Sequence, residues 1–78
     1  MAYKFGKRIG YHDGHFWREA SNGHELNEAL GAAYGCRGEH GPALPGIARV
    51  RGYDIYRTSE GDLVAVSCID VYRVEEVA

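Results

Sequence analysis

Hydrophobic and polar residues alternate along the first twenty positions, on both sides of the dipeptide Asp13-Gly14. A period of two is typical of β-strands, and Asp-Gly suits a tight hairpin turn. We therefore predict a hairpin of residues 4–12 and 15–20 joined by a two-residue loop. Its core face is expected to carry Tyr3, Phe5, Ile9, Tyr11, Phe16 and Ala20. Its outer face is expected to carry Lys4, Arg8, His12, His15, Trp17 and Glu19.

The pattern then changes to the spacing of a helix. Apolar residues recur at i, i+3, i+4, i+7 and i+8, namely at Leu26, Ala29, Leu30, Ala33 and Tyr34. Asn22 and Glu25 have the spacing of a capping box, and Gly35 is a suitable residue to end the helix. Gly31 costs about 1 kcal/mol relative to alanine inside a helix. Its presence predicts close packing on a sheet or room for a partner.

The second half of the chain has the pattern of strands. Residues 37–46 contain three glycines and both prolines, which predicts a loop. Strands are expected at 47–51, 53–58 and from 63 to 74, with a hairpin turn at 59–62. Val64 and Val66 have the opposite parity to Ile69 and Val71. This predicts a bulge or break near Cys68-Ile69, or a strand covered on both faces.

These elements define the expected fold class. We predict an α+β domain over residues 1–78, an antiparallel sheet of about four to five strands with one helix packed on one face, in the order β-β-α-β-β-β. A length of 78 residues suffices for one core but not for separate nucleotide and substrate lobes. An apolar content of 45% and a net charge of −2 are those of a folded chain rather than a disordered one.

Composition also bears on the compartment. Two cysteines are too few for the disulfide framework of a small secreted protein, so we expect reduced thiols. The first eight residues do not precede an apolar run, and the chain has no hydrophobic stretch of the length that spans a membrane. We therefore expect a cytoplasmic location without a signal peptide or membrane anchor.

Histidine and cysteine are the candidate metal ligands. They stand at His12, His15, His24, Cys36, His40 and Cys68. The spacing of Cys36 and His40 suits zinc, but a structural site normally has a second closely spaced pair, which the sequence lacks. The alternative is that Cys36 packs as a small apolar residue while the histidines are exposed. We expect no metal and no cofactor, although binding at Cys36 and His40 stays open.

Catalytic groups do not form a recognisable set. Cys68 lies in an apolar segment, where a thiol is inert. The carboxylate pairs Glu60/Asp62 and Glu75/Glu76 fall at a turn and near the last residue, where solvation keeps a carboxyl pKa ordinary. Phosphate-binding glycine motifs are absent from the sequence. We therefore expect a protein that is not an enzyme.

Basic and aromatic residues on the first hairpin suggest nucleic-acid binding as one function. Single-stranded nucleic acids are held by cations beside aromatic platforms. The candidate residues are Lys4, Arg8, His15, Trp17, Arg49 and Arg51. The alternative interpretation is a solvated sheet face whose charges maintain solubility.

Charge segregation favours protein binding as the leading function. Residues 1–53 carry seven bases and five acids, whereas residues 54–78 carry two bases and six acids. Such asymmetry orients a protein toward a partner, and tyrosine is common at interface hot spots. The candidate partner-binding residues are Asp54, Tyr56, Asp70, Tyr72, Glu75 and Glu76. The tyrosines are alternatively ordinary sheet residues, and an exposed sheet edge could form a homodimer.

The plan of the whole chain resembles that of anti-CRISPR proteins, small proteins encoded by phages and mobile elements. The shared features are a strand pair around Asp13-Gly14, one helix ending at Tyr34-Gly35, a hairpin around Glu60-Gly61, and surface acids without a catalytic motif. The likeness covers all 78 residues and includes no diagnostic motif. It implies a non-catalytic inhibitor in the host cytoplasm that binds a subunit of a CRISPR–Cas complex and acts by steric occlusion.

Overall fold

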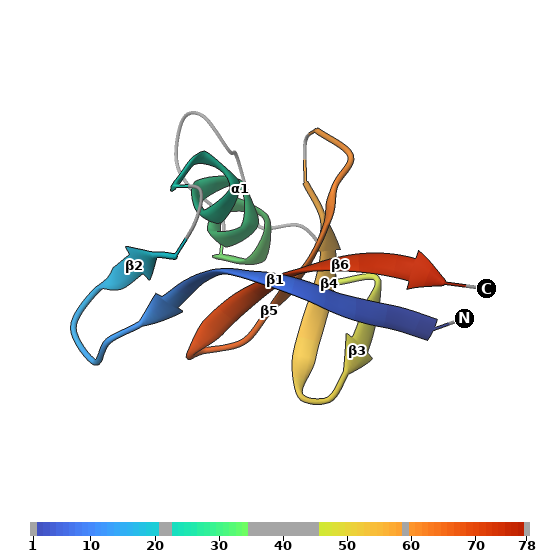
Figure 1. The fold of residues 1–78 in the computed structure, drawn as a ribbon, viewed down its shortest axis with the longest axis horizontal. Helices are drawn as coiled ribbons and strands as arrows, with labels where there is room; N and C mark the ends of the chain where they lie inside the picture. The colour runs from blue at the N-terminus through green and yellow to red at the C-terminus, as the bar shows by residue number, and fades with distance from the viewer. Residues whose placement is uncertain (1, 21–22, 35–45, 59, 78) are drawn as a thin grey trace.

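The computed structural model describes residues 2–20, 23–34, 46–58 and 60–77. Its elements are β1 (Ala2–His12), β2 (Trp17–Glu19), α1 (Gly23–Tyr34), β3 (Ala48–Val50), β4 (Tyr53–Arg57), β5 (Leu63–Val66) and β6 (Asp70–Val77). The strands form one antiparallel sheet in the order β2-β1-β6-β5-β4-β3, with α1 on one face (Figure 1). The α+β class is confirmed, with one helix in the described ranges. Over those ranges the sheet has six strands rather than four to five.

The additional strand arises from a break at residues 67–69, near the predicted position. Ser67 Oγ accepts hydrogen bonds from the backbone N–H of Ile69 (3.2 Å) and Asp70 (3.1 Å), which closes a turn between β5 and β6. Ile69 is left 61% exposed in this turn. Val71 then lies on the same sheet face as Val64, and the predicted parity conflict is removed.

The first hairpin has a different register from the predicted one. His12 pairs with Trp17, so the loop contains four residues rather than two. The Asp13 carboxylate accepts the N–H groups of His15 (2.8 Å) and Phe16 (2.9 Å) and pairs with Arg18 at 2.7 Å. These bonds hold the pKa of Asp13 well below its ordinary value, the bond from Phe16 contributing most. The Asp13 carboxylate therefore stabilises the four-residue turn. A two-residue loop would not allow these bonds.

This register reverses two predicted side-chain positions. Phe16, expected in the core, lies in the turn and is 65% exposed. Trp17, expected on the outer face, is half-buried and packs against the buried cluster that contains Ile9 and Leu26, and its ring centroid lies 5.4 Å from that of His12. The structure therefore corrects both assignments.

Two irregularities in β1 also alter which side chains share a face. The pairing with β6 gains one residue on β1 between Phe5 and Arg8 and another between Arg8 and Gly10. Each such bulge changes the parity of the strand. Lys4 is therefore opposite Glu75, whereas Arg8 is opposite Tyr72, on the other face of the sheet. The predicted common outer face of Lys4 and Arg8 is wrong.

The first of two buried clusters lies between α1 and the sheet. We call it the helix-side core, and it consists of Ile9, Leu26, Ala29, Val64, Val66 and Val71. The helix contacts it through much of the predicted stripe, although Tyr34 is 59% exposed. Gly31 is buried, consistent with close packing of the helix. The sheet also approaches closely, since a Cβ added at Gly10 would overlap Leu26.

The second cluster lies on the sheet face opposite the helix, and we call it the far-face core. Its buried residues are Ile55, Ala65 and Val74, surrounded by half-buried Tyr3, Phe5, Ala48, Val50, Tyr53, Leu63 and Tyr72. The Phe5 and Tyr53 rings lie 5.1 Å apart. Their strands are three inter-strand spacings apart, about 14 Å along a flat sheet. The sheet must therefore curl around these rings, as the change in strand direction from β1 to β4 in Figure 1 shows.

A hydrogen bond from Tyr53 stabilises this curled arrangement of strands. Its hydroxyl donates a 2.5 Å hydrogen bond to Asp70 Oδ1, which also accepts one from Ser67 Oγ at 3.0 Å. Burial, followed by the bond to Asp70, raises the pKa of Tyr53 from 10.0 to about 12. The bond therefore joins β4 to the start of β6 while the phenol remains protonated.

An alkaline titration tests this arrangement. Tyr53 should ionise near pH 10 in the unfolded chain but near pH 12 in the folded protein. Its contribution to stability is therefore complete below pH 10 and is lost as the pH rises from 10 to 12. The difference in tyrosinate absorbance between wild type and Tyr53→Phe should show a transition near pH 12, which Asp70→Asn lowers. A difference transition at pH 10 in the wild type would contradict the buried bond.

Candidate functional site

The predicted partner-binding residues are divided between the two faces of the sheet. Asp54 and Tyr56 lie on the helix side, where they line a hollow. Glu75 is also on the helix side, but it lies on β6 opposite Lys4 and does not line this hollow. The other three, Asp70, Tyr72 and Glu76, share the far face with the rings of Tyr3 and Tyr53. The structure therefore divides the predicted residues into a helix-side pair, Asp54 with Tyr56, and a far-face group around Tyr53, rather than one acidic surface.

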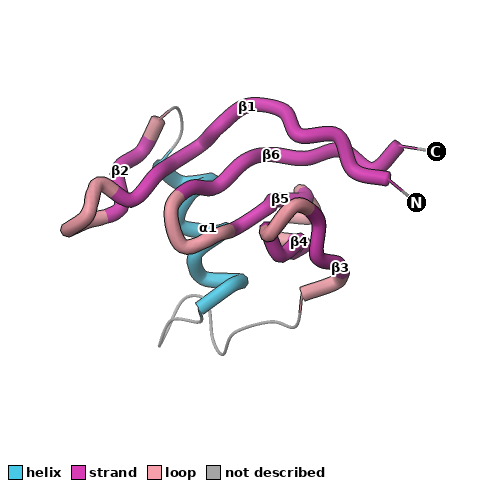
Figure 2. The backbone as a smooth tube through the Cα atoms, turned by 90° about the horizontal axis from the view of Figure 1, so that it is seen from below, coloured by secondary structure: helices cyan, strands magenta, loops and turns pink. Residues whose placement is uncertain are grey.

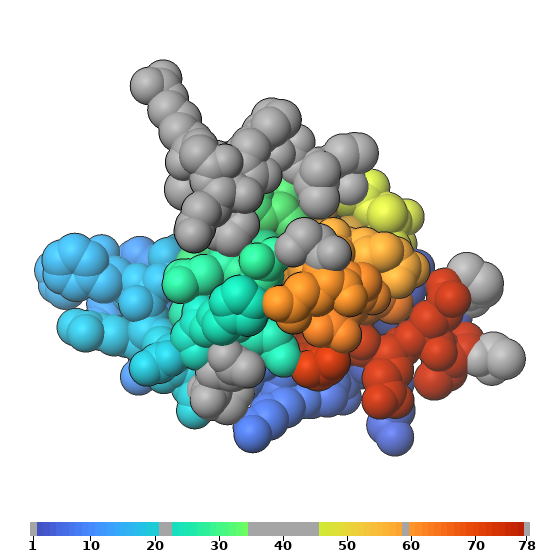
Figure 3. All heavy atoms as spheres, turned by 90° about the horizontal axis from the view of Figure 1, so that it is seen from above, coloured from blue at the N-terminus to red at the C-terminus, as the bar shows by residue number. Residues whose placement is uncertain are grey.

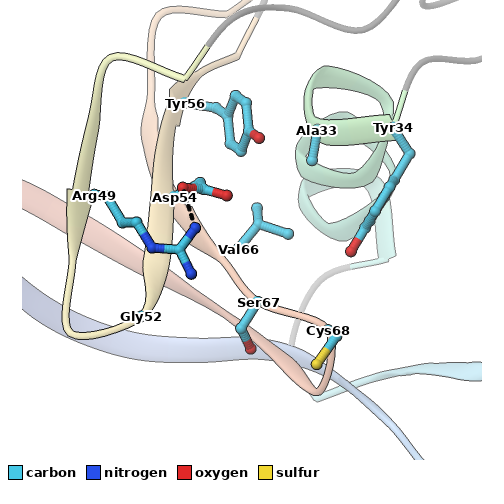
Figure 4. A pocket seen from close by; sticks show the side chains of 9 residues that line it. All are labelled: Ala33, Tyr34, Arg49, Gly52, Asp54, Tyr56, Val66, Ser67 and Cys68. Atoms are coloured by element: carbon cyan, nitrogen blue, oxygen red, sulfur yellow. Dashed lines mark hydrogen bonds and ion pairs between the residues drawn. The ribbon is translucent and has the colours of Figure 1, made fainter.

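The hollow containing that pair lies between the end of α1 and strands β3 to β5 (Figure 4). It has a volume of about 240 Å³ and is lined by Ala33, Tyr34, Arg49, Gly52, Asp54, Tyr56, Val66, Ser67 and Cys68. Arg49 and Asp54, opposite each other on β3 and β4, form a 3.3 Å ion pair on one wall of the hollow. Burial, followed by the charge of Asp54, raises the pKa of Tyr56.

This hollow is small. Ligand pockets usually measure about 300–1,000 Å³, so its volume of about 240 Å³ lies below the usual range. Cys68 is exposed at its rim, and among the described residues that line the hollow there is no histidine to activate the thiol. Arg49 is already engaged by Asp54.

The predicted nucleic-acid residues are also dispersed. Lys4 lies on the helix side near the start of β1, Trp17 packs on the helix-side core and His15 lies in the first turn. Arg49 lines the hollow near α1. On the far face, Arg8 lies over the Tyr11 ring at 4.9 Å and Arg51 over the Phe5 ring at 5.6 Å. Only Arg8 and Arg51 thus share the aromatic face.

Several acids have partners within the domain. Arg73 binds Glu25 at 2.5 Å and Asp62 at 2.8 Å, and His24 contacts Glu60 at 2.7 Å. Asp54 and Asp70 are held by Arg49 and Tyr53. Much of the negative charge after residue 53 is therefore paired within the domain. These pairs join its strands and helix to one another.

The cations of β1 differ from these acids. Within the described part of the chain, no carboxylate forms an ion pair with Lys4, Lys7 or Arg8. Residues 2–12 contain these three cations and no acid. Lys4 and Arg8 are among the predicted site residues but Lys7 is not, although this one-sided run of charge is evident in the sequence. β1 is therefore a strand whose positive charge is available to a partner.

The outer side of β1 is also unpaired over most of its length. β6 pairs with its inner side from Ala2 to Tyr11, whereas β2 pairs with its outer side only from Gly10 to His12. In Figure 2, no described strand lies beyond the rest of β1. We call the outer side of residues 2–8 the β1 edge. It presents backbone N–H and C=O groups that no described strand pairs.

A second hollow adjoins the β1 edge on the helix side. It has a volume of about 250 Å³ and is lined by Lys4, Gly6, Lys7, Arg73 and Glu75. Arg73 is paired with Glu25 and Asp62. The positive charge that the hollow can offer a ligand therefore comes from Lys4 and Lys7. The space-filling view in Figure 3 shows residues of β1 and β6 reaching the surface beside one another.

The described residues contain no group of three or more histidine, cysteine or acidic side chains able to hold a metal. His12 Nδ1 accepts the N–H of Gly14 at 3.1 Å, so this ring is used in the turn. The candidate pair of Cys36 and His40 lies outside the described residues.

Among the described residues, no helix has the length and apolar character needed to cross a membrane.

Comparison with known proteins adds no relative to this geometry. Neither the family models, nor the curated proteins, nor the solved structures include a match to this chain.

Proposed function

We propose that the protein is a non-catalytic protein-binding module that takes an extended segment of a partner as an additional strand on the β1 edge. The observation that carries this proposal is the unpaired outer side of residues 2–8 on a strand whose inner side pairs with β6 from Ala2 to Tyr11, with two bulges. An exposed edge of this kind is the template for β-strand addition, in which backbone hydrogen bonds provide affinity.

The position of the edge supports this function. β1 is the longest strand, with eleven residues, and it is held by β6, which contacts both cores through Val71 and Val74. The backbone groups of residues 2–8 are therefore fixed before a partner arrives. Pre-organisation lowers the entropy cost of binding an extended segment. By contrast, the two terminal strands of the sheet, β2 and β3, have only three residues each.

Selection from a library of random peptides displayed on phage tests the proposal without a known partner. We expect peptides selected on the immobilised protein to protect backbone amides of residues 2–8 from hydrogen exchange. The amides of β3, at the opposite edge, provide an internal control and should exchange unchanged. Protection confined to the hollow near Tyr34 and Tyr56, or a selection that yields no binder, would overturn the proposal.

The resemblance to anti-CRISPR proteins suggests a subunit of a CRISPR–Cas complex as the partner, occluded by strand addition. This target stays a prediction. It is tested by co-expressing the protein with defined CRISPR–Cas systems during phage challenge, where an inhibitor restores phage growth. If a variant with a disrupted β1 edge restored phage growth equally well, the protein would inhibit the CRISPR–Cas system without strand addition on that edge.

Nucleic-acid binding is the second candidate, favoured by the two arginine–ring contacts on the far face. Arg8 and Arg51 supply cations beside Tyr11 and Phe5, an arrangement able to hold a single strand by charge and stacking. Fluorescence anisotropy with a labelled single-stranded oligonucleotide at low salt measures it. Binding that Arg8→Ala and Arg51→Ala each abolish would favour this candidate over strand addition.

A further inference from the structure

Building on the proposed strand addition, we infer that the β1 edge selects a partner segment in which acidic residues alternate with apolar ones. The acidic side chains lie on the helix side, beside Lys4 and Lys7. The apolar side chains lie on the far side, beside Tyr3 and Phe5. The occupant is thus an acidic, amphipathic strand of another protein.

The alternation follows from the geometry of any added strand. Successive side chains of a strand point to opposite faces, and each lies next to residues of the neighbouring strand on the same face. At the start of β1, the two faces differ in chemistry. Lys4 is on the helix side, whereas Tyr3 and Phe5 are on the far side. A partner strand therefore meets a cationic row and an aromatic row.

The cationic row has space and charge for a carboxylate. The hollow beside Lys4 and Lys7 measures about 250 Å³, enough for one acidic side chain. Glu75 lines it too, but no ion pair joins Glu75 to either lysine. Both ammonium groups are exposed and mobile enough to follow a ligand, which suits an incoming carboxylate.

The aromatic row continues the far-face core to the edge of the sheet. Tyr3 and Phe5 are half-buried and pack against the buried cluster of Ile55, Ala65 and Val74. Each ring is covered by the sheet on its inner side. An apolar side chain from an added strand would cover the outer side and extend the same core.

Charge excludes a second copy of this chain as the preferred occupant. Antiparallel pairing of two β1 edges would bring Lys4 and Lys7, on the helix side of each copy, close to the same two lysines of the other. Like charges facing one another across strands are destabilising, and lysine on an edge is a common means of preventing self-association. The same lysines attract an acidic strand, so they distinguish a partner from a second copy.

Three labelled nine-residue peptides test the inference by fluorescence anisotropy. The first alternates glutamate and valine, the second alternates serine and valine, and the third has the composition of the first with its glutamates and valines in separate blocks. We expect the alternating acidic peptide to bind at least about tenfold more tightly than either other peptide. Two exposed charge contacts are expected to contribute a factor of this order, which added salt reduces.

Matched variants locate the contact. Lys4→Gln/Lys7→Gln should weaken the alternating acidic peptide about tenfold, to the affinity of the serine peptide. Arg49→Gln/Arg57→Gln removes the same charge from β3 and β4 and should leave affinity unchanged. Lys4→Arg/Lys7→Arg keeps the charge and should retain binding, which separates a charge effect from a change in fold.

Two outcomes would overturn the inference in different ways. Equal binding of the serine and glutamate peptides at the β1 edge would refute acid selection while leaving strand addition intact. Equal binding of the blocked acidic peptide would show charge attraction without strand geometry. If the displayed library also yielded no peptide that protects residues 2–8, the proposed function itself would fail.

Discussion

Replacing Ile55 with alanine is expected to lower the free energy of unfolding by about 3–4 kcal/mol, the usual cost of removing a large buried aliphatic side chain. Ile55 is fully buried in the far-face core, between Ala48 on β3 and Ala65 on β5. Small neighbours cannot expand into the space, so a cavity should remain. A domain of this length has a total stability of about 4–12 kcal/mol. The loss is therefore a large part of the whole, measurable by urea unfolding.

Ile69 provides a matched control for this change. It is the same residue type but is 61% exposed in the β5–β6 turn, so Ile69→Ala should change stability by less than about 0.5 kcal/mol. If Ile55→Ala fails to fold, Ile55→Val should still fold, with a loss of about 1 kcal/mol. Equal effects at positions 55 and 69 would mean that the face opposite the helix is not a core.

The second large effect is expected at Gly10, where alanine should destabilise the protein by about 2 kcal/mol. A Cβ at this position would overlap Leu26 Cδ1 and lie 2.7 Å from Cδ2 and 3.0 Å from Cγ. Leu26 is itself buried between the helix and the sheet, so it cannot turn toward solvent. The sign is informative, because alanine in place of glycine in a strand normally stabilises by about 0.5–1 kcal/mol.

A double-mutant cycle isolates the contact between β1 and α1. Leu26→Ala alone should cost about 3 kcal/mol through the cavity it leaves. In that background the methyl group of Gly10→Ala enters vacated space, so its cost should fall to zero or become a gain. A coupling of about 2 kcal/mol is expected from urea unfolding of the four proteins. Additive effects would show that Gly10 does not approach Leu26.

Local patterns predicted the helix and most strands because their signals are short-range. The apolar spacing from Leu26 to Tyr34 placed α1, and the parity conflict between Val66 and Ile69 placed the break between β5 and β6. The helix is rotated relative to the predicted stripe, since Ala32 is buried and Tyr34 is exposed.

The register of the first hairpin could not be obtained in this way. Asp13-Gly14 permits both a two-residue and a four-residue loop, and the choice depends on carboxylate bonds to His15 and Phe16 and on Arg18. The bulges of β1 depend on pairing with β6, more than sixty residues away in the chain for most of the ladder. The Asp13 bonds are short-range, but the dipeptide pattern does not distinguish the two loop lengths, so the faces of Phe16 and Trp17 were predicted wrongly. The bulges have no local signal at all.

The candidate site was predictable only in part for the same reason. The cations of β1 are evident in the sequence, but their availability is not, because it depends on which acids find partners elsewhere. Arg73 takes up Glu25 and Asp62, and Tyr53 binds Asp70. These contacts join distant segments, and they reduce the negative charge left for a partner. An unpaired edge likewise becomes visible only when the strand order is known.

The pairing of the first and last strands has a consequence for the mechanics of the domain. Ala2 is opposite Val77, so both ends of the described chain leave the sheet at the same end of one ladder (Figure 1). A force that pulls these ends apart acts across the ladder and opens its hydrogen bonds one after another, instead of loading them together in shear. The domain should therefore yield to low tension at its termini, beginning at the residues that form the β1 edge.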